Sequence, residues 1–355
     1  MRIECEPTDA NGAPDRGAQS GQAVAPTTPV DEVAESMRFE TEDVDELVDL
    51  VKPWDVDLQQ ISAGKFHGEF EGIRTPRMLI YRESWLRRIV ARGESPEGMI
   101  MIGTNAVPDL SEVVWCGKTI DQSRIGCSGP GGEIGFATPD CGQHVVALIR
   151  PDLVENAVGS SVSRALLTRS HIELLPLSGR RFISSILHLL RVYRLEPDLL
   201  ADPFAVRSLE SFVLEQLGAV TESGSRSRRT ESRASRRRLV TRAIEFIGVS
   251  TVPLTALELA SRLGVSQRTL ELTFHEILGC TPAAYLRIRR MNQAHRDLAR
   301  ANPGDATVTE IAIKWGFLHA GRFSAAYREL FGCLPSETLK KQRHSLAYSP
   351  LALPN

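Results

Sequence analysis

Two segments near the C-terminus place hydrogen-bonding side chains just ahead of apolar residues that recur at helical spacing. The first segment carries Gln267, Arg268 and Glu271, and the second carries His319 and Arg322. Arginine can donate two hydrogen bonds to guanine, glutamine suits adenine, and glutamate can accept a bond from cytosine N4. These residue types predict hydrogen bonding to base edges, provided that helices present them to a DNA groove.

The elements that must position these side chains are written twice in the sequence. "LGVSQRTLELTFHEILGCTP" (263–282) and "WGFLHAGRFSAAYRELFGCLP" (315–335) each open with a hinge, and each close with Gly-Cys-x-Pro. The hinges, at Gly264 and Gly316, lie 52 residues apart, and the closing glycines lie 53 residues apart. A unit repeated at a nearly fixed interval predicts that it is used twice.

The local signals within each unit predict a helix, a glycine turn and a second helix. Thr255 and Glu258 have the spacing of a capping box, Gly264 suits the positive φ of a sharp turn, and Ser266 suits the cap of the second helix. Thr307 or Thr309 is the corresponding cap in the second unit. This order of elements is the helix-turn-helix, whose second helix can lie in the major groove. The predicted buried positions are Leu257, Ala260, Leu263, Leu270, Phe274, Ile277 and Leu278 in the first unit and Ala312, Phe323, Tyr327 and Phe331 in the second.

The segment between the two units, Pro282 to Arg300, predicts one continuous helix. Proline suits the first position of a helix, and most of the following residues are good helix formers. Nineteen residues at about 1.5 Å each give a strut of roughly 28 Å. That length is close to the ~34 Å between successive major-groove faces on one side of B-DNA, so one chain could place two reading helices in adjacent groove segments.

Charge is unevenly divided along the chain, although the formal net charge is only −2. Residues 224–343 hold 21 Lys and Arg against 10 Asp and Glu, which leaves 21 basic and 34 acidic residues elsewhere. This division favours a polyanionic partner for the basic part. A non-specific architectural DNA binder would be basic throughout, which residues 1–223 are not.

The N-terminal half has a different texture. Between about Phe39 and Arg150, short apolar runs alternate with Gly, Pro, Asn and Asp clusters, which predicts a small β-barrel or sandwich. Two helices are expected after Pro151, over 182–190 and 209–217. They either cover the barrel or mediate self-association, and the sequence does not separate these alternatives.

Several kinds of site are not indicated by the sequence. The six cysteines form no CxxC pair and no zinc-site spacing with histidine, and no phosphate-binding loop occurs, so we expect no metal and no cofactor. Scattered thiols, an N-terminus unlike a signal peptide and the lack of an apolar run of about 18 residues predict a soluble, cytoplasmic protein with no membrane partner.

The stretch "TEIAIKWGFLHAGRFSAAYRELFGCLPSETL" (309–339) is similar to the signature of the AraC/XylS family of transcription regulators, especially its XylS-like branch. The resemblance covers about residues 238–343. It implies a seven-helix domain that binds double-stranded promoter DNA, usually activates transcription with RNA polymerase, and is fused to a cupin-like effector-binding or dimerisation domain. We therefore predict an α+β chain with a disordered leader (1–35), an effector-binding or dimerisation domain (36–220), a flexible linker (221–237), an all-α double helix-turn-helix domain (238–343) and a tail (344–355).

The base-reading candidates are the five polar residues named at the outset. Leu272, Gly321 and Ala325 stand where members of the family often carry polar side chains, so a base contact by Leu272 would be apolar. A second set of cationic or polar residues is expected to contact phosphates, which positions a protein on DNA without reading its sequence. This set is Ser266, Arg289, Arg290, Lys314 and Arg328.

A sensor domain needs a concave, largely apolar pocket with a few polar groups. His67, Arg82, Trp85 and Trp115 lie in the β-rich region and are the candidates for it. The resemblance implies a small, often aromatic effector, which would shift an equilibrium between DNA-competent and incompetent arrangements, with a homodimer as one route.

The main alternative is an enzyme with a DNA-binding tail, such as a repair protein. DNA-alkylation repair proteins that share this tail carry a Pro-Cys-His-Arg nucleophile, which is absent here, as are the nucleophile elbow and HExxH patterns. We therefore predict that the chain is not an enzyme.

Overall fold

A computed structural model of the 355-residue chain describes residues 34–50, 54–106, 113–120, 124–174, 176–221, 231–250, 254–301, 304 and 306–341. The predicted tail and nearly all of the predicted leader lie outside these ranges, as do residues 222–230 of the predicted linker. Helix α5 (Glu231–Val249) begins inside the stretch expected to be linker. Its first turns are rich in Arg, a good helix former, and they continue directly into an apolar stripe.

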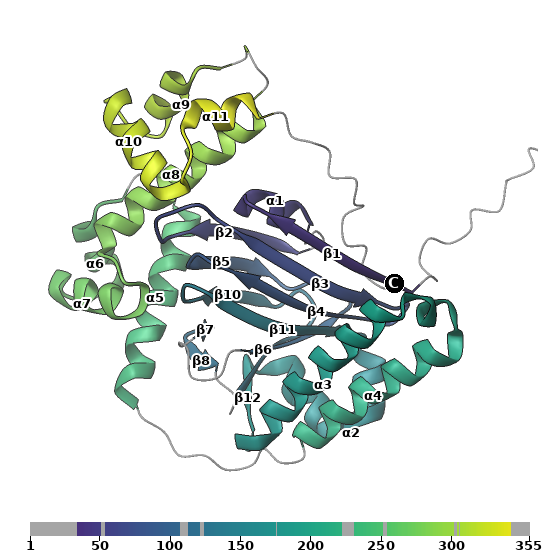
Figure 1. The fold of residues 1–355 in the computed structure, drawn as a ribbon. Coiled ribbons are helices and arrows are strands. Elements are labelled where there is room, and N and C mark those ends of the chain that lie inside the picture. Colours follow the sequence, from purple (N-terminus) through teal and green to yellow (C-terminus); the bar gives the residue numbers. More distant parts are fainter. Residues whose placement is uncertain are drawn as a thin grey trace, which may run out of the picture. The chain divides into compact units, whose positions relative to one another are not determined.

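Two antiparallel sheets form the N-terminal domain, as the prediction of a β-barrel or sandwich anticipated (Figure 1). Within the described residues, one sheet has seven strands in the order β1-β3-β4-β11-β6-β9-β12, and the other has five in the order β2-β5-β10-β7-β8. The first sheet comprises β1 (Glu35–Thr41), β3 (Gly68–Arg74), β4 (Met78–Trp85), β11 (Gly142–Ile149), β6 (Ile100–Asn105), β9 (Arg124–Ser128) and β12 (His171–Glu173). The second comprises β2 (Asp55–Gln60), β5 (Ile89–Glu94), β10 (Glu133–Ala137), β7 (Val113–Trp115) and β8 (Lys118–Ile120).

Strand β11 shows how one sheet serves two cores. Successive side chains of a strand point to opposite faces, so Val145 and Ala147 pack in one cluster while Val146 and Leu148 pack in another. The first cluster lies between the seven-stranded sheet and its covering helices. The second lies between the two sheets, where a ligand cavity would be found.

Three helices cover the outer face of the seven-stranded sheet (Figure 1). The apolar stripes predicted in both segments are buried there, for example at Phe182, Ile186, Leu209 and Val213. Covering the barrel is thus their structural role, and self-association stays a prediction. These three helices are α2 (Pro151–Thr168), α3 (Pro176–Leu195) and α4 (Pro203–Thr221). The N-terminal domain also contains the short 3-10 helix η2 (Pro197–Ala201) and, nearer the start of the chain, helix α1 (Val44–Leu50).

The described part of the C-terminal domain forms seven helices, α5 to α11, in agreement with the family resemblance. The predicted capping box is present at Thr255, and Ser266 caps the second helix of the first unit. Of the two predicted caps of the second unit, Thr307 is the N-cap, and it also forms a capping box. Gly264 and Gly316 have φ of 69° and 79°, the left-handed region that glycine adopts without strain. Besides α5, the helices are α6 (Ala256–Leu263), α7 (Gln267–Leu278), α8 (Pro282–Arg300), α9 (Val308–Lys314), α10 (Ala320–Phe331) and α11 (Pro335–Lys340).

One predicted core position is wrong. Leu257 is 65% exposed, and Leu259 is fully buried in its place. At about 100° per residue, Leu259, Ala260 and Leu263 share one face of α6, whereas Leu257 lies some 200° from Leu259. The remaining predicted core residues of the two units are buried or partly buried.

Helix α8 is continuous over the predicted range and joins the two units (Figure 1). Tyr285, near its start, belongs to the core of the first unit, and Met291, Ala294 and Leu298 belong to the core of the second. The two units are therefore packed on one helix. None of the helices in the described ranges is long and apolar enough to cross a membrane.

Candidate nucleic-acid interface and effector cavity

The start of α7 presents the predicted base-reading residues of the first unit to solvent. Gln267, Arg268 and Glu271 are exposed, and so is Leu272, at 57%. The Gln267 side-chain amide donates a hydrogen bond of 2.9 Å to Glu271, whereas the Arg268 guanidinium has no hydrogen bond or ion pair with any described residue. Arg268 is therefore available for a bidentate bond without losing an internal contact.

The second unit presents fewer polar groups. His319 is the N-cap residue of α10, and its side chain and that of Arg322 are exposed. Gly321 and Ala325 are exposed on the same turns, so this helix offers mostly backbone and small side chains around the two candidates. His319 and Arg322 are therefore the predicted base-reading side chains that α10 leaves exposed.

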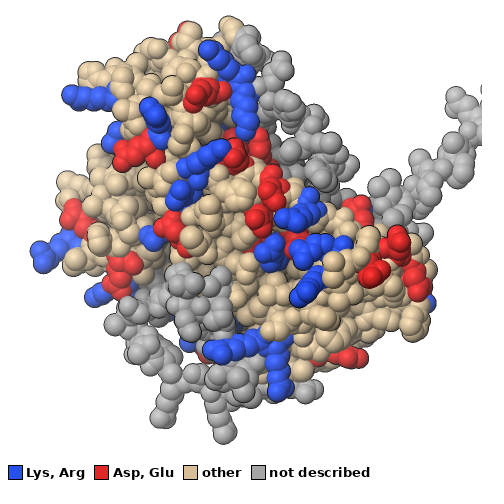
Figure 2. Space-filling view, in the orientation of Figure 1, with Lys and Arg blue, Asp and Glu red and all other residues tan. Residues whose placement is uncertain are grey.

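The predicted phosphate contacts fall into two groups. Arg328 is exposed and has no side-chain partner among the described residues. The other cations are already engaged: Lys314 pairs with Asp297 at 2.7 Å, Arg290 lies 5.5 Å from the centroid of the Phe317 ring, and Arg289 donates to a backbone carbonyl at 3.3 Å. Figure 2 shows Lys and Arg side chains projecting from the helical domain with Asp and Glu between them, so the basic surface is interrupted. Ser266 is exposed, but its hydroxyl accepts from the Thr269 backbone N–H as the helix cap.

Helix α8 also covers the open edge of strand β2. The side-chain amide of Asn292 accepts from the Gln60 N–H at 3.1 Å and donates to the Gln60 carbonyl at 3.0 Å, as a neighbouring strand would. One helical turn later, Arg296 donates to the Leu58 carbonyl at 2.5 Å. Because β2 is an edge strand, these bonds satisfy backbone groups that would otherwise lack partners.

An ion-pair cluster surrounds this contact. Arg296 pairs with Asp45 at 2.8 Å and with Asp57, and the Asp45 side chain is only 6% exposed. His295 lies 3.2 Å from Asp43. Although burial alone opposes it, the hydrogen bond and charge of His295 hold the pKa of Asp43 at about 2.

Three of these residues have the types that bind metals. Ligand atoms of Asp43, Asp45 and His295 lie within 4.8 Å of one another. However, the Asp45 carboxylate is already paired with Arg296, and the second ring nitrogen of His295 is hydrogen-bonded to the Tyr327 hydroxyl at 2.5 Å. A guanidinium at this position would repel a cation, so the cluster is better explained as a contact between α8 and the barrel.

The recognition helices themselves are held at their C-terminal ends by the N-terminal domain. Arg88 donates to the carbonyl of Leu278 at 2.8 Å in α7, and the Gln60 side chain donates to the carbonyl of Leu330 at 2.6 Å in α10. Terminal carbonyls of a helix have no partner within it. The barrel therefore supplies donors to both reading helices while leaving their N-terminal turns exposed.

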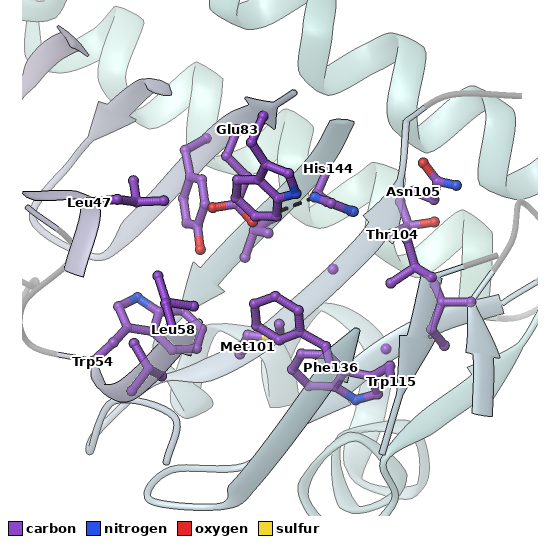
Figure 3. A pocket seen from close by; sticks show the side chains of 18 residues that line it. Leu47, Trp54, Leu58, Glu83, Met101, Thr104, Asn105, Trp115, Phe136 and His144 are labelled. Atoms are coloured by element: carbon purple, nitrogen blue, oxygen red, sulfur yellow. Dashed lines mark ion pairs between the residues drawn. The ribbon is translucent and has the colours of Figure 1, made fainter. Parts of the chain in front are cut away.

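A cavity of about 70 Å³ lies between the two sheets (Figure 3). Its wall is mostly aromatic and aliphatic. Trp115, Phe136 and Leu58 come from the five-stranded sheet, Leu47 comes from α1, and Trp85 and Met101 come from the seven-stranded sheet. The Trp115 and Phe136 rings stack with centroids 6.0 Å apart. An apolar wall of this kind, with a few polar groups, is typical of a small-molecule site.

The polar groups of the cavity lie in one row across the seven-stranded sheet. Glu83 of β4, His144 of β11 and Asn105 of β6 are paired in register. Burial raises the pKa of Glu83 to about 8 and lowers the pKa of His144 to about 4, so both are uncharged near neutral pH. Their closest side-chain atoms are 3.8 Å apart, too far for a hydrogen bond.

Of the predicted effector residues, Trp85 and Trp115 line this cavity, whereas His67 and Arg82 do not. Arg82 lies between Tyr81 and Glu83 on β4, so the alternation of the strand turns it to the other face, where it pairs with Glu71 at 3.3 Å. His67 is outside the strands and 3.7 Å from Glu69. Sequence reasoning missed Glu83 and His144, although Tyr81, Glu83 and Trp85 show the period of two that would place them on one face.

Two capped helix-turn-helix units on one connecting helix, joined to a β-barrel with an internal cavity, define a DNA-binding protein with a second, ligand-sized site. The sequence profile of a helix-turn-helix domain family matches residues 259–341. Over 262 residues the chain is 30% identical to the "Probable thc operon regulatory protein" of Rhodococcus erythropolis, an alignment that covers 73% of this chain and 76% of that protein. The chain belongs to the AraC/XylS family of transcription regulators.

A further relative matches over a shorter stretch. The chain is 36% identical over 103 residues to "XylDLEGF operon transcriptional activator 3" of Pseudomonas putida, which is 29% of this chain and 31% of that protein. Among solved structures, the AraC-like transcriptional activator CuxR is 14% identical, covering 74% of this chain and 96% of that chain with a TM-score of 0.39. With so low a TM-score, this likeness does not bear on the family assignment.

Proposed function

We propose that this regulator reads promoter DNA with the N-terminal turns of α7 and α10 and activates transcription in response to a small molecule bound in the barrel. The observation that carries the proposal is that both turns expose arginine while their helices are fixed on a continuous α8. Arg268 and Arg322 are assigned to base edges, with Gln267, Glu271 and His319 beside them. Arg328 is assigned to phosphate, and Arg289, Arg290, Lys314 and Ser266 would reach phosphate only by exchanging an internal contact.

Activation is favoured because relatives of the helical domain carry that role in their names. RNA polymerase is then the expected protein partner, and the cytoplasm, where promoter DNA is found, is the expected compartment. We likewise propose that the chain forms a homodimer and that it has no enzymatic activity.

The route from the cavity to DNA would run through β2 and α1. Val56 and Leu58 of β2 and Leu47 of α1 line the cavity. The same two elements bond α8 through the Leu58 carbonyl and Asp45. A ligand that moves these side chains would alter the contacts that hold α8, and could therefore favour one arrangement of the two reading helices over another.

A footprint of the purified chain on the DNA flanking its own gene tests the proposal. We expect protection of a short site that spans two adjacent major-groove segments. The Arg268→Ala variant should bind that site about 1–3 kcal/mol more weakly and tolerate substitution at one base pair.

Arg328→Ala is the matched control. Loss of a phosphate contact should weaken binding to all sequences alike and reduce the slope of log K against log salt by about one. Equal, sequence-independent losses for both variants would reassign Arg268 to phosphate. Uniform binding to any duplex would favour an architectural protein, and no duplex binding at all would contradict the proposal.

A further inference from the structure

The cavity between the two sheets contains buried polar atoms that have no partner. Both ring nitrogens of His144 and the indole nitrogen of Trp115 are shielded from solvent and form no hydrogen bond. His144 is 7% exposed and Trp115 is 5% exposed. Buried polar groups in folded proteins are nearly always bonded, so three such atoms around one cavity indicate that a bound molecule supplies the partners.

The Trp115 ring is fixed where it can meet such a molecule. It lies against Gly126 of β9, where a side chain's first carbon would come within 3.1 Å of the ring. Phe136 stacks on its side. The indole N–H can only donate a hydrogen bond, so the ligand must offer an acceptor atom, which an alkylammonium group lacks.

The charge of the residues that line the cavity indicates the charge of the ligand. Among the described residues that line the cavity, Glu83 is the only acidic or basic side chain other than His144, and none is Lys or Arg. Figure 3 shows Glu83 and His144 facing each other across the polar end of the cavity. A carboxylate ligand would meet a carboxyl group and no cation, so its desolvation would not be offset.

We infer that the cavity binds an uncharged molecule of about one ring whose polar atoms form hydrogen bonds with His144 and with Trp115. An amide offers both kinds of polar atom, because its carbonyl can accept from an indole and its N–H can donate to an imidazole or to the carboxyl group of Glu83. The size of the ligand follows from the cavity volume of about 70 Å³. Because each water needs roughly 10–15 Å³ of such space, the cavity has room for a molecule as large as about 5–7 waters. The inference rests on the proposed effector role of the barrel and specifies the class of effector.

Calorimetric titration of the full chain near neutral pH, without DNA, tests it with three molecules of one shape: benzamide, benzoate and benzylammonium. We expect benzamide to bind at least about 10-fold more tightly than either ion, the equivalent of one good hydrogen bond against an uncompensated charge. Tighter binding of benzoate or of benzylammonium would overturn the inference, and so would failure of all three at millimolar concentration.

Two variants locate the binding. Glu83→Gln keeps an uncharged hydrogen-bonding group of the same shape, and should leave benzamide affinity within about threefold. His144→Leu should weaken it by about 10-fold, whereas His67→Leu, outside the cavity, should not change it. A large loss in Glu83→Gln would show that the site uses a charged carboxylate, and equal binding by His144→Leu would place benzamide elsewhere. Because no DNA is present, either result leaves the footprint test of the proposed function intact.

Discussion

Replacing Glu83 by glutamine should flatten the dependence of stability on pH in the alkaline direction. In the folded chain, burial raises the pKa of Glu83 to about 8 from an ordinary value of 4.5. Between these values the folded state keeps a proton that the unfolded state releases. The stability from the protonated form is therefore present at low pH and lost as pH rises toward 8. Glutamine has no proton to lose.

His144 contributes a pH dependence of stability with the opposite sign, which limits the pH range in which the effect of Glu83 can be measured alone. Its pKa falls to about 4 in the fold from 6.5, so stability rises with pH until 6.5 and is unaffected above it. Of these two groups, only Glu83 changes its contribution to stability between pH 6.5 and 8. This interval of 1.5 pH units, at about 1.36 kcal/mol per unit, corresponds to a loss of roughly 2 kcal/mol. The wild-type chain should lose about this much more stability across the window than the Glu83→Gln variant.

Urea unfolding at about pH 6.5 and 8, followed by tryptophan fluorescence, measures this difference. Trp54, Trp85 and Trp115 lie in the barrel and Trp315 in the helical domain, so the signal reports mainly on the domain that contains Glu83. Parallel losses in both proteins would refute the reasoning. They would indicate that Glu83 is already ionised at pH 6.5 in the folded chain, so that it releases no proton across the window.

Three further predictions concern single side chains of the helical domain. Arg296→Met should destabilise the chain by about 3 kcal/mol, because buried Asp45 loses its counter-ion, whereas Arg300→Met at an exposed position of α8 should change the free energy of unfolding by less than about 0.5 kcal/mol; denaturant titration compares the two. Thr255→Ala should cost about 1 kcal/mol through loss of the α6 capping box, and Thr255→Ser should restore most of it, as read by hydrogen exchange of α6. Leu272→Asn should alter preference at one base pair in a binding-site selection, and an unchanged preference would mean that Leu272 does not reach the groove.

The helical domain could be predicted in detail because its signals are local. A capping box depends on two residues three positions apart, and a left-handed turn depends on one glycine, as at Thr255 and Gly264. The error at Leu257 arose where only the phase of a short helix decided the outcome. An eight-residue helix contains too few apolar positions to fix that phase from the sequence.

The barrel could be predicted only as a class of fold. Which side chains meet in the cavity depends on strand register, since Glu83 and His144 are 61 residues apart and become neighbours only through the pairing of β4 with β11. A pattern of period two says that Tyr81, Glu83 and Trp85 share a face, but not which face is inside. Because Arg82 and Trp85 lie on opposite faces of such a strand, the same alternation shows that these two candidates could not both line the cavity.

The barrel bonds the helical domain directly, so a mechanism of regulation must explain how these contacts change when an effector binds. Strand β2 turns Leu58 into the cavity, while the Leu58 carbonyl bonds α8 at the open edge of the sheet, so the cavity and α8 are separated by a single strand. A packed interior transmits small displacements rather than absorbing them. Because both recognition helices pack on α8, and the Gln60 side chain at the end of β2 also bonds α10, a shift of β2 cannot reach one unit without the other. An effector in this cavity would therefore be expected to change the two DNA contacts together, as one step.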